Sequence, residues 1–487
     1  MKPNRRIRTY GAPQPGWRRY QNQLRGASRR SSRPKPGRSK GGGGLRWPGL
    51  LLVFLVALYG VRESPLDSAV FVPAALFDPG ISSRGEAPGD LSADLPPPPL
   101  PEPSHLIDKT DVQALLTPDL FLNLTESDFD FAFDGRRFRV ETTLDAPLQR
   151  RMAASLQPET ARYLGAVVLE AETGRVLAMV SHDSVDPGNN ACLASLFPAA
   201  SVFKIVTAAA AISEIGLRGD SYLGYAGGKY TLYKYQLRES PGRKVYRISL
   251  RDSFAQSVNP VFGRLGTRRL GKTALARHGE AFGFNRPIPF EIPVDLSPLR
   301  VTDEPFQWAE VASGFNRTTL LSPLHGAMIA AATVSENGQL IAPTIVDRIR
   351  DENGLLLYQA PESPASVGQA LAPEAAREMR GLMEETIRTG TCRRSFRGFE
   401  QDPVLGRLVL GGKTGTMGSR IHPDRLYDWF VGFAEEKEGG RRIAVAVAVA
   451  HEKLIGTKAN EYARSVMETF FANQFARESG DASATSG

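Results

Sequence analysis

The fold is decided by LVLGGKTG at residues 408–415, YDWFVGFAE at 427–435 and RIAVAVAVA at 442–450. Each segment is short and apolar, which is typical of strands. The second and third carry apolar residues on both alternating faces, as strands do when helices cover both sides of their sheet. We therefore expect these three segments to form strands of one buried sheet.

Strands are also predicted at the start of the folded part, at residues 137–145, 163–170 and 175–181. The last two are joined by AETG, a hairpin signal with glycine in the turn. Helices are predicted at residues 108–116, 146–156, 199–212, 251–265, 322–337, 373–388 and 459–476. Pro260 is expected to interrupt the helix at residues 251–265. Strands at both ends with helices between them predict an α+β fold whose central sheet joins both ends of the folded part.

The positive charge is concentrated at the N-terminus. Residues 1–46 hold 14 of the 60 lysines and arginines and no acidic residue, so the other 441 residues carry 46 basic and 52 acidic ones. A tail of this composition, rich in Gly, Pro, Ser and Arg, is predicted to be a disordered basic tail. Because the net charge of +8 comes from this tail, we expect no nucleic-acid partner.

Residues 47–62 form the predicted transmembrane anchor. They contain LLLVFLVALY at residues 50–59, between Arg46 and Arg62. A cleaved signal peptide or a buried helix is the alternative. The positive-inside rule places residues 1–46 in the cytoplasm. The chain is thus predicted to cross the cytoplasmic (inner) membrane once, with a periplasmic or otherwise extracytoplasmic catalytic domain.

Three further regions follow the anchor. Residues 63–135 are predicted to be a Pro-rich linker and a short N-terminal region, since LPPPPLPEP at residues 95–103 favours an extended spacer. The catalytic domain is expected at residues 136–475. Residues 476–487 are expected to be a disordered C-terminal tail.

Cysteine and histidine usage gives no support for a metal site. Cys192 and Cys392 permit one disulfide without requiring it. The six histidines are scattered without an HExxH motif, and no CxxC is present. We therefore expect neither a metal ion nor a cofactor.

The first of three polar motifs is SVFK at residues 201–204. Ser201 and Lys204 lie three residues apart at the first turn of an Ala-rich predicted helix, so the amine can take the hydroxyl proton. A lysine acts as a base only if burial or neighbouring cations lower its pKa, and the apolar surroundings favour this. Taken alone, the motif is weak, and an N-cap serine with a surface lysine would be the preferred interpretation.

The second motif is SVN at residues 257–259. Ser257 and Asn259 can reach the same cleft from one turn, where the serine passes a proton and the asparagine holds an amine or an amide. A loop capped by polar side chains is the alternative explanation. In order along the chain, however, this motif follows a candidate nucleophile and base.

The third motif is KTGT at residues 413–416. Lys413 supplies a positive field, Gly415 lets a ligand lie close to the backbone, and the hydroxyls of Thr414 and Thr416 can bind a carboxylate. An exposed strand end is the alternative. Together the three motifs supply a nucleophile, a base, a proton relay and a cationic anchor, the parts needed to open an amide through a covalent acyl intermediate.

In this order the motifs resemble those of the penicillin-binding protein transpeptidases and the related serine β-lactamases. The resemblance covers roughly residues 136–475. It implies a central, mostly antiparallel sheet flanked by helices, with an all-helical subdomain. Other segments that resemble the family are residues 142–149, 165–181, 322–328, 390–394 and 428–433.

The resemblance also implies residue roles. Ser201 would attack the penultimate D-Ala carbonyl of a peptidoglycan stem peptide, with Lys204 as base. Ser257 would relay the proton to the leaving D-Ala. Asn259 would orient Lys204 and the substrate.

The third motif would bind the substrate's terminal carboxylate through Lys413, Thr414 and Thr416, with Gly415 between them. The backbone N–H groups of Ser201 and Thr416 would form the oxyanion hole. The amine of a second stem peptide would resolve the ester and make a cross-link. β-Lactam antibiotics would instead acylate the serine and remain covalently bound to it.

Two alternatives remain open at this point. A D,D-carboxypeptidase or a β-lactamase would use the same site and let water resolve the ester. A non-catalytic penicillin-binding sensor or scaffold would bind wall fragments without turnover. We find no glycosyltransferase segment before the folded part, so a monofunctional transpeptidase working with a separate glycan polymerase is expected.

Overall fold

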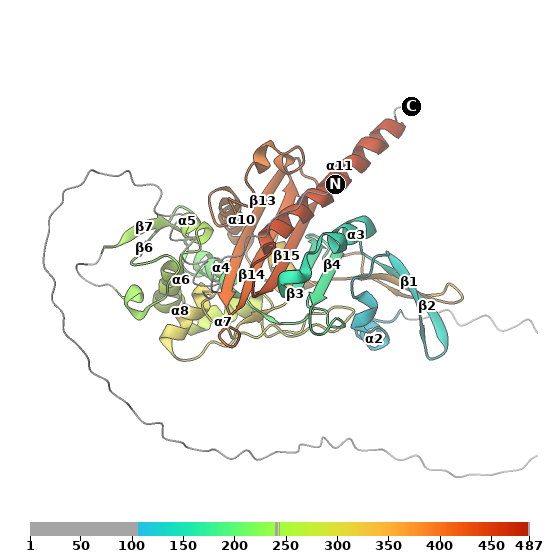
Figure 1. Cartoon of the computed structure of the whole chain (residues 1–487), viewed down its shortest axis with the longest axis horizontal. Helices are drawn as coiled ribbons and strands as arrows, with labels where there is room; N and C mark the ends of the chain where they lie inside the picture. The colour runs from blue at the N-terminus through green and yellow to red at the C-terminus, as the bar shows by residue number, and fades with distance from the viewer. Residues whose placement is uncertain (1–105, 239–241, 243, 486–487) are drawn as a thin grey trace, which may run out of the picture. The chain divides into compact units, whose positions relative to one another are not determined.

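The computed structural model describes residues 106–238, 242 and 244–485, and its centre is a five-stranded sheet (Figure 1). The strand order is β13-β14-β15-β3-β4, and every neighbouring pair is antiparallel. The strands are β3 (Ala161–Glu170), β4 (Val176–Asp183), β13 (Leu408–Gly418), β14 (Arg425–Glu436) and β15 (Arg442–Glu452). Because β15 pairs with β3, the sheet joins both ends of the folded part, as predicted.

Helices cover both faces of this sheet, and the alternation in β15 shows why. Successive side chains of a strand point to opposite faces. The alanines at 444, 446, 448 and 450 enter one apolar core, whereas Ile443 and the valines at 445, 447 and 449 enter the other. The flanking helices are α9 (Pro323–Val334) and α10 (Pro373–Arg388) in the alanine-side core, and α3 (Ala146–Ser155) and α11 (Ala459–Thr485) in the valine-side core. The predicted α+β class is confirmed.

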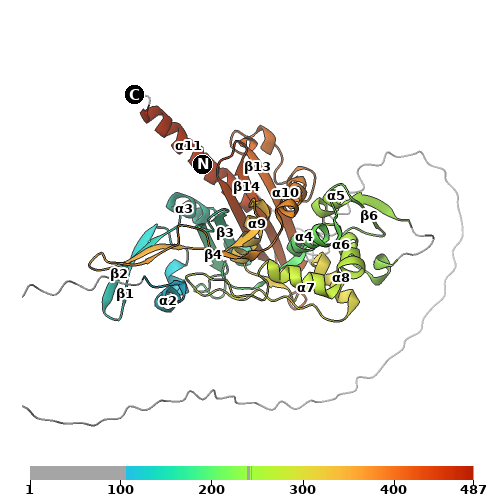
Figure 2. The same ribbon diagram turned by 180° about the vertical axis from the view of Figure 1, so that it is seen from behind.

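A largely helical subdomain packs at one end of the sheet, as both views show (Figures 1 and 2). Its helices are α4 (Lys204–Ile215), α5 (Leu250–Ala255), α6 (Asn259–Leu265), α7 (Gly271–Ala281) and α8 (Pro305–Ser313). The subdomain is not all-helical, because it also carries a hairpin of β6 (Tyr222–Tyr225) and β7 (Tyr246–Ser249). The sequence pattern gave no prediction of this hairpin.

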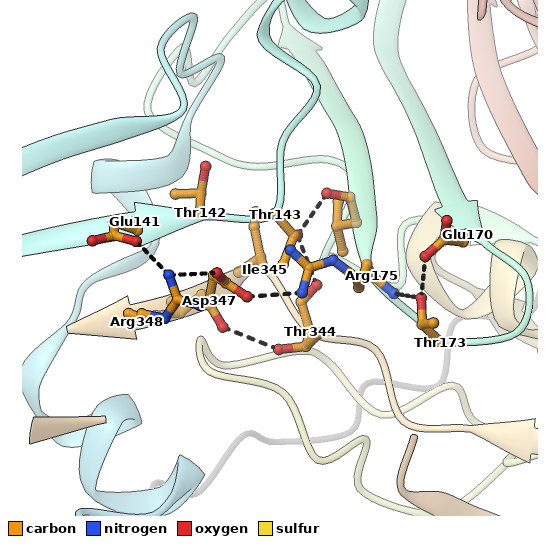
Figure 3. Close-up of polar contacts among 12 residues, drawn as sticks. Glu141, Thr142, Thr143, Glu170, Thr173, Arg175, Thr344, Ile345, Asp347 and Arg348 are labelled. Carbon is orange, nitrogen blue, oxygen red and sulfur yellow. Dashed lines mark hydrogen bonds and ion pairs between the residues drawn. The ribbon is translucent and has the colours of Figure 1, made fainter. Parts of the chain in front are cut away.

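A second sheet has the order β1-β2-β10-β11. Its strands are β1 (Asp128–Phe133), β2 (Arg136–Thr142), β10 (Val346–Asp351) and β11 (Leu356–Gln359). Figure 3 shows how it is fixed to the central sheet. Arg175, in the β3–β4 turn, donates to Asp347 of β10 at 2.8 Å, and the Thr143 hydroxyl donates to the Val176 carbonyl at 2.7 Å. These contacts join the two sheets at the β3–β4 hairpin.

Ordered structure continues beyond both predicted limits of the catalytic domain. Before residue 136, β1 pairs along its whole length with β2, and α2 (Lys109–Leu115) begins at an Asp108 capping box. After residue 475, α11 continues to Thr485, and Arg477 forms an ion pair with Asp145 at 3.3 Å. Regular structure therefore continues on both sides of residues 136 and 475, and the domain boundaries themselves stay a prediction.

The helix predicted at residues 251–265 is in fact two helices, α5 and α6. The break precedes Pro260 and lies at Ser257, whose φ of +55° is in the left-handed region. Pro260 lies in the first turn of α6, where its missing N–H has no helical partner to lose. Proline therefore begins the second helix and does not interrupt a single one.

The predicted basic tail, the anchor at residues 47–62 and the Pro-rich spacer lie outside the described residues. From residue 106 onward, no described helix combines the length and apolar character needed to cross a bilayer. Cys192 and Cys392 are both free and buried. They lie in the alanine-side and the valine-side core, respectively.

Candidate active site

Ser201 lies in a single 3₁₀ turn, Ala200–Phe203, that leads directly into α4. The sequence predicted one continuous helix from Ala199. The difference arises at Ala200, whose φ of +47° turns the chain sharply just before the serine. Lys204 is the first residue of α4, and its Nζ lies 2.9 Å from the Ser201 Oγ. The predicted pairing of these two side chains is therefore present in the structure.

The Lys204 amine is fully buried and touches three oxygens. Besides the Ser201 hydroxyl, they are the Asn259 Oδ1 at 2.8 Å and the main-chain carbonyl of Ser313. Burial, and then the nearby charge of Lys413, holds the pKa of Lys204 well below its ordinary value.

This arrangement determines where the lone pair of a neutral amine points. A neutral amine has two N–H donors and one lone pair. The amide oxygen of Asn259 and the carbonyl of Ser313 only accept hydrogen bonds, so each takes one N–H. The lone pair is then left for the hydroxyl proton of Ser201, which is the geometry of a general base beside its nucleophile.

Lys413 and Ser257 form a second pair beside the first. Lys413 is fully buried within β13, and its Nζ donates to the Ser257 Oγ at 3.1 Å and to the Thr414 carbonyl at 2.9 Å. Burial lowers the pKa of Lys413 to about 7. The predicted strand at residues 408–415 already contained Lys413, and it continues beyond the motif because β13 pairs with β14 as far as Gly418.

Thr414 and Thr416 lie on the face of β13 opposite Lys413, as strand alternation requires. The Thr414 Oγ1 is 2.5 Å from the Thr391 Oγ1, and the Thr416 Oγ1 donates to Asp428 at 3.4 Å. Both hydroxyls therefore have protein partners. Thr391, on the loop after α10, was not singled out as a site residue from the sequence.

Gly415 allows β13 to pack closely against the turn that carries Ser201. A Cβ at this position would lie 3.3 Å from the Ser201 nitrogen and 3.3 Å from the Ala200 Cβ, tighter than most contacts in proteins. Glycine thus allows the third motif to approach the first. Among the eight predicted site residues, five have side chains that contact one another in two groups, and Gly415 packs against the serine's turn. Thr414 and Thr416 lie beside Gly415 in β13.

Sequence reasoning missed the segment at Ser313 and Gly314. Gly314 ends α8 with a φ of +64°, and a Cβ there would lie 1.8 Å from the Ala200 carbonyl oxygen. A glycine after an apolar helical segment indicates a helix end. Nothing in the pattern could show that the Ser313 carbonyl meets Lys204, because every residue type offers the same carbonyl.

Among the described residues, no group of three or more His, Cys, Asp or Glu side chains is placed to hold a metal ion. The polar groups gathered around Ser201 are amines, hydroxyls, an amide and main-chain groups. Nucleophilic attack by the serine and proton transfer to an amine are the chemistry that such groups can carry.

Comparisons with known proteins agree with this geometry. The family model of the penicillin-binding protein transpeptidase domain matches residues 164–472. The peptidoglycan D,D-transpeptidase PbpA of Mycolicibacterium smegmatis is 26% identical over 369 residues, which cover 68% of this chain and 71% of that protein. The stage V sporulation protein D of Bacillus subtilis is 27% identical over 63% of this chain and 49% of its own length.

A solved structure shares the fold. The crystal structure of PBPA from Mycobacterium tuberculosis superposes with a TM-score of 0.55 at 23% identity, covering 68% of this chain and 80% of that one. Since the family model matches well over half of the chain, the chain belongs to the penicillin-binding protein transpeptidase family, which confirms the serine D,D-transpeptidase class predicted from its three motifs.

Proposed function

We propose that this protein is a membrane-anchored D,D-transpeptidase that cross-links peptidoglycan stem peptides through an acyl-enzyme on Ser201, and that β-lactams acylate the same serine. The observation that carries the proposal is the 2.9 Å contact between the Ser201 hydroxyl and the Lys204 amine. Two further acceptors already hold both N–H groups of that amine when it is neutral.

In the acylation step, the Ser201 Oγ forms a bond to the penultimate D-Ala carbonyl carbon while its proton passes to Lys204. Collapse of the tetrahedral intermediate breaks the peptide C–N bond. The leaving D-Ala nitrogen takes a proton through the Ser257 hydroxyl, which contacts Lys413. Asn259 keeps Lys204 oriented throughout.

The charge of Lys413 would attract the terminal carboxylate of the donor peptide, with Thr414 and Thr416 beside it on the edge of β13. The backbone N–H groups of Ser201 and Thr416 would stabilise the oxyanion. In the second step, an acceptor amine attacks the ester carbonyl and gives a proton to Lys204, the C–O bond to Ser201 breaks, and the serine takes that proton from Lys204.

The predicted arrangement of the whole chain completes the proposal. Residues 47–62 would anchor the protein in the cytoplasmic membrane by one span, with residues 1–46 in the cytoplasm. The catalytic domain would then act on the periplasmic or extracytoplasmic side, where peptidoglycan is built. A separate glycan polymerase would supply un-cross-linked strands.

Intact-mass measurement after penicillin G treatment tests the nucleophile. We expect the full chain to gain the mass of one penicillin G molecule, and the Ser201→Ala variant to gain none. Peptide mapping must place the adduct on Ser201. An unmodified wild-type protein, or an adduct on another residue, contradicts the proposal.

Incubation with un-cross-linked strands that bear pentapeptide stems tests the outcome of the reaction. A transpeptidase forms peptide-linked dimers and releases D-Ala. A carboxypeptidase releases D-Ala without dimers, and a β-lactamase regenerates free enzyme from the penicillin adduct within minutes. A sensor or scaffold releases no D-Ala.

A further inference from the structure

Exposed tyrosines gather on one part of the helical subdomain. In the described part of the chain, five tyrosines are exposed, and they fall within 25 residues; they are Tyr222, Tyr230, Tyr233, Tyr235 and Tyr246. We refer to the last four of these as the tyrosine surface. Soluble proteins usually scatter exposed large side chains singly, so a cluster of this kind indicates a binding surface.

Tyr230, Tyr233, Tyr235 and Tyr246 lie near one another, whereas Tyr222, three residues before Tyr225 in β6, lies on the opposite face of the hairpin from Tyr246. Tyr246 stacks on the buried Tyr225 with ring centroids 5.4 Å apart, and Tyr233 stacks on Tyr235 at 5.7 Å. A Cβ on Gly227, two residues after Tyr225, would lie 3.0 Å from the Tyr235 hydroxyl. Burial and the neighbouring phenols of Tyr246 and Tyr230 raise the pKa of Tyr225, which places Tyr230 in the same group.

Basic side chains are interleaved with these rings. The Lys244 amine lies 5.0 Å from the Tyr246 ring centroid, whereas the Arg247 guanidinium lies 5.3 Å from that of Tyr222, outside the tyrosine surface. Lys234, beside Tyr233, lies 5.6 Å from the Phe306 ring of α8. Residues 222–238 contain no acidic residue. The surface thus combines flat aromatic faces with positive charge.

The tyrosine surface is continuous with the active site. The main-chain N–H of Asn259 donates to the Lys229 carbonyl at 2.7 Å, and the Lys229 amine donates to Gln256 at 2.5 Å. Tyr230 is the next residue along the chain. Both ribbon views place β6 beside α5 and α6, the helices that flank Ser257 (Figures 1 and 2).

Building on the proposed function, we propose that the tyrosine surface binds the glycan strand that carries the stem peptides. The C–H face of a pyranose ring is apolar and its rim is hydroxylated, so it matches a tyrosine, which has an apolar face and a polar tip. The stem peptides carry carboxylates, which Lys234 and Lys244 attract. A strand held there presents its stem peptides beside Ser257.

Binding of glycan strands to the penicillin-acylated full chain tests this proposal. Acylation of Ser201 blocks the active site, so the affinity that remains reports on the tyrosine surface. The test variant is Tyr233→Ser with Tyr246→Ser, whose side chains are 54% and 41% exposed. The matched control is Leu454→Ser with Phe133→Ser, which are 69% and 50% exposed and lie elsewhere. Thermal melts verify that both variants fold.

We expect the tyrosine variant to bind strands bearing stem peptides about tenfold more weakly than the wild type, and the control to bind them like the wild type. Strands stripped of peptides by an amidase are expected to bind the wild type more weakly than intact strands do, and free pentapeptide is expected not to bind.

Equal affinity of the tyrosine variant and the control for intact strands overturns the proposal. So does binding of the wild type to anionic phospholipid vesicles but not to strands, which would assign the surface to a membrane. If penicillin leaves the wild type unmodified, the proposed function fails, whereas strand binding to the unmodified protein still decides the role of the tyrosine surface.

Discussion

Two fully buried lysines share this active site, and their different surroundings separate their roles. Lys204 is held by acceptors that suit a neutral amine. Lys413 contacts one hydroxyl and one carbonyl, and its pKa is lowered to about 7 by burial. Below that pH it is charged and can attract a carboxylate, and a nearby positive charge in turn keeps Lys204 neutral.

The rate of acylation by penicillin is expected to fall about tenfold per pH unit above pH 7. Lys413 loses its proton in that range, because its pKa is about 7, and the carboxylate of the antibiotic then loses its cationic partner. The measurement is the second-order acylation rate constant of the wild type from pH 5 to 10.

The Lys413→Arg variant is the control for this pH profile. Its guanidinium stays charged over the whole range, so the decrease above pH 7 is expected to disappear even if the absolute rate is lower. A decrease that persists unchanged in this variant would show that another group causes it.

Asn259→Asp is expected to slow acylation at pH 7 by about 100-fold or more. A carboxylate 2.8 Å from the Lys204 amine would favour its charged form and raise its pKa, so the base would be protonated at neutral pH. The ratio of this variant's rate to the wild-type rate at the same pH should rise as the pH is raised. Stopped-flow acylation with a fluorescent penicillin from pH 6 to 10 measures both effects.

Asn353→Asp, in the exposed turn between β10 and β11, adds the same charge far from the site and should leave the rate unchanged. An Asn259→Asp enzyme as fast as this control at pH 7 would exclude the assignment of Lys204 as base.

At the scale of elements, two helices end at glycines with nearly the same backbone conformation but different neighbours. Gly216 ends α4 with a φ of +65°, and a Cβ there would meet nothing within 4 Å. Gly314 ends α8 with a φ of +64°, and a Cβ there would overlap the Ala200 carbonyl. Substitutions at these two positions therefore separate two effects. Both force a side chain into the left-handed backbone region, but only the one at Gly314 adds a steric overlap with Ala200.

Gly314→Ala is expected to abolish acylation or reduce it by more than 100-fold, because the added methyl group must displace the turn that carries Ser201. Gly216→Ala should lower stability by only about 1 kcal/mol and keep the wild-type acylation rate. Acylation kinetics and thermal melts of both variants provide the measurement. Equal acylation by the two would mean that the turn absorbs the methyl group.

The elements show what the sequence could predict. Strongly periodic helices were predicted closely, and α10 has the predicted bounds, Pro373–Arg388. The strands β1, β10 and β11 and the hairpin β6–β7 were missed, because they are short and half-exposed and their pairing depends on distant partners. The left-handed turns at Ala200 and Ser257 were missed since neither residue type favours them.

The site was more predictable than the turns that build it. Ser201, Lys204, Ser257, Asn259 and Lys413 were all singled out from motif order, and the structure brings their side chains into contact. What the sequence could not supply is main-chain geometry, such as the carbonyl that Ser313 offers to Lys204. The catalytic roles of these five residues stay predictions until the variants above are measured.

At the scale of the whole molecule, a buried histidine links stability to pH. His325 of α9 is fully buried, and burial lowers its pKa to about 4. Its Nε2 lies 2.6 Å from the Phe282 carbonyl, which only accepts, so Nε2 carries the proton and Nδ1 accepts from the Ser297 hydroxyl at 2.8 Å. A second proton on this ring would reverse the hydrogen bond with Ser297 and place a positive charge in the buried core.

Stability is expected to decrease by up to about 3 kcal/mol from this residue alone as the pH falls from about 6.5 to about 4. In that range the unfolded chain binds a proton on His325 and the folded chain does not, so acid favours unfolding. Urea unfolding at several pH values compares the wild type with His325→Gln. The free energy of unfolding of the variant should depend less steeply on pH than that of the wild type. Identical slopes for the two proteins would contradict the role given to His325.

The antiparallel pairing of Glu170 with Ile443 has a consequence for biogenesis. Roughly 270 residues must leave the ribosome before β3 can meet its partner, and folds dominated by such distant pairings form slowly. Until then the nascent β3–β4 hairpin has an open edge that can pair with another chain. A cell that exports this polypeptide unfolded must therefore protect that edge, and holdase chaperones would meet the N-terminal half long before the nucleophile and the KTGT strand come together.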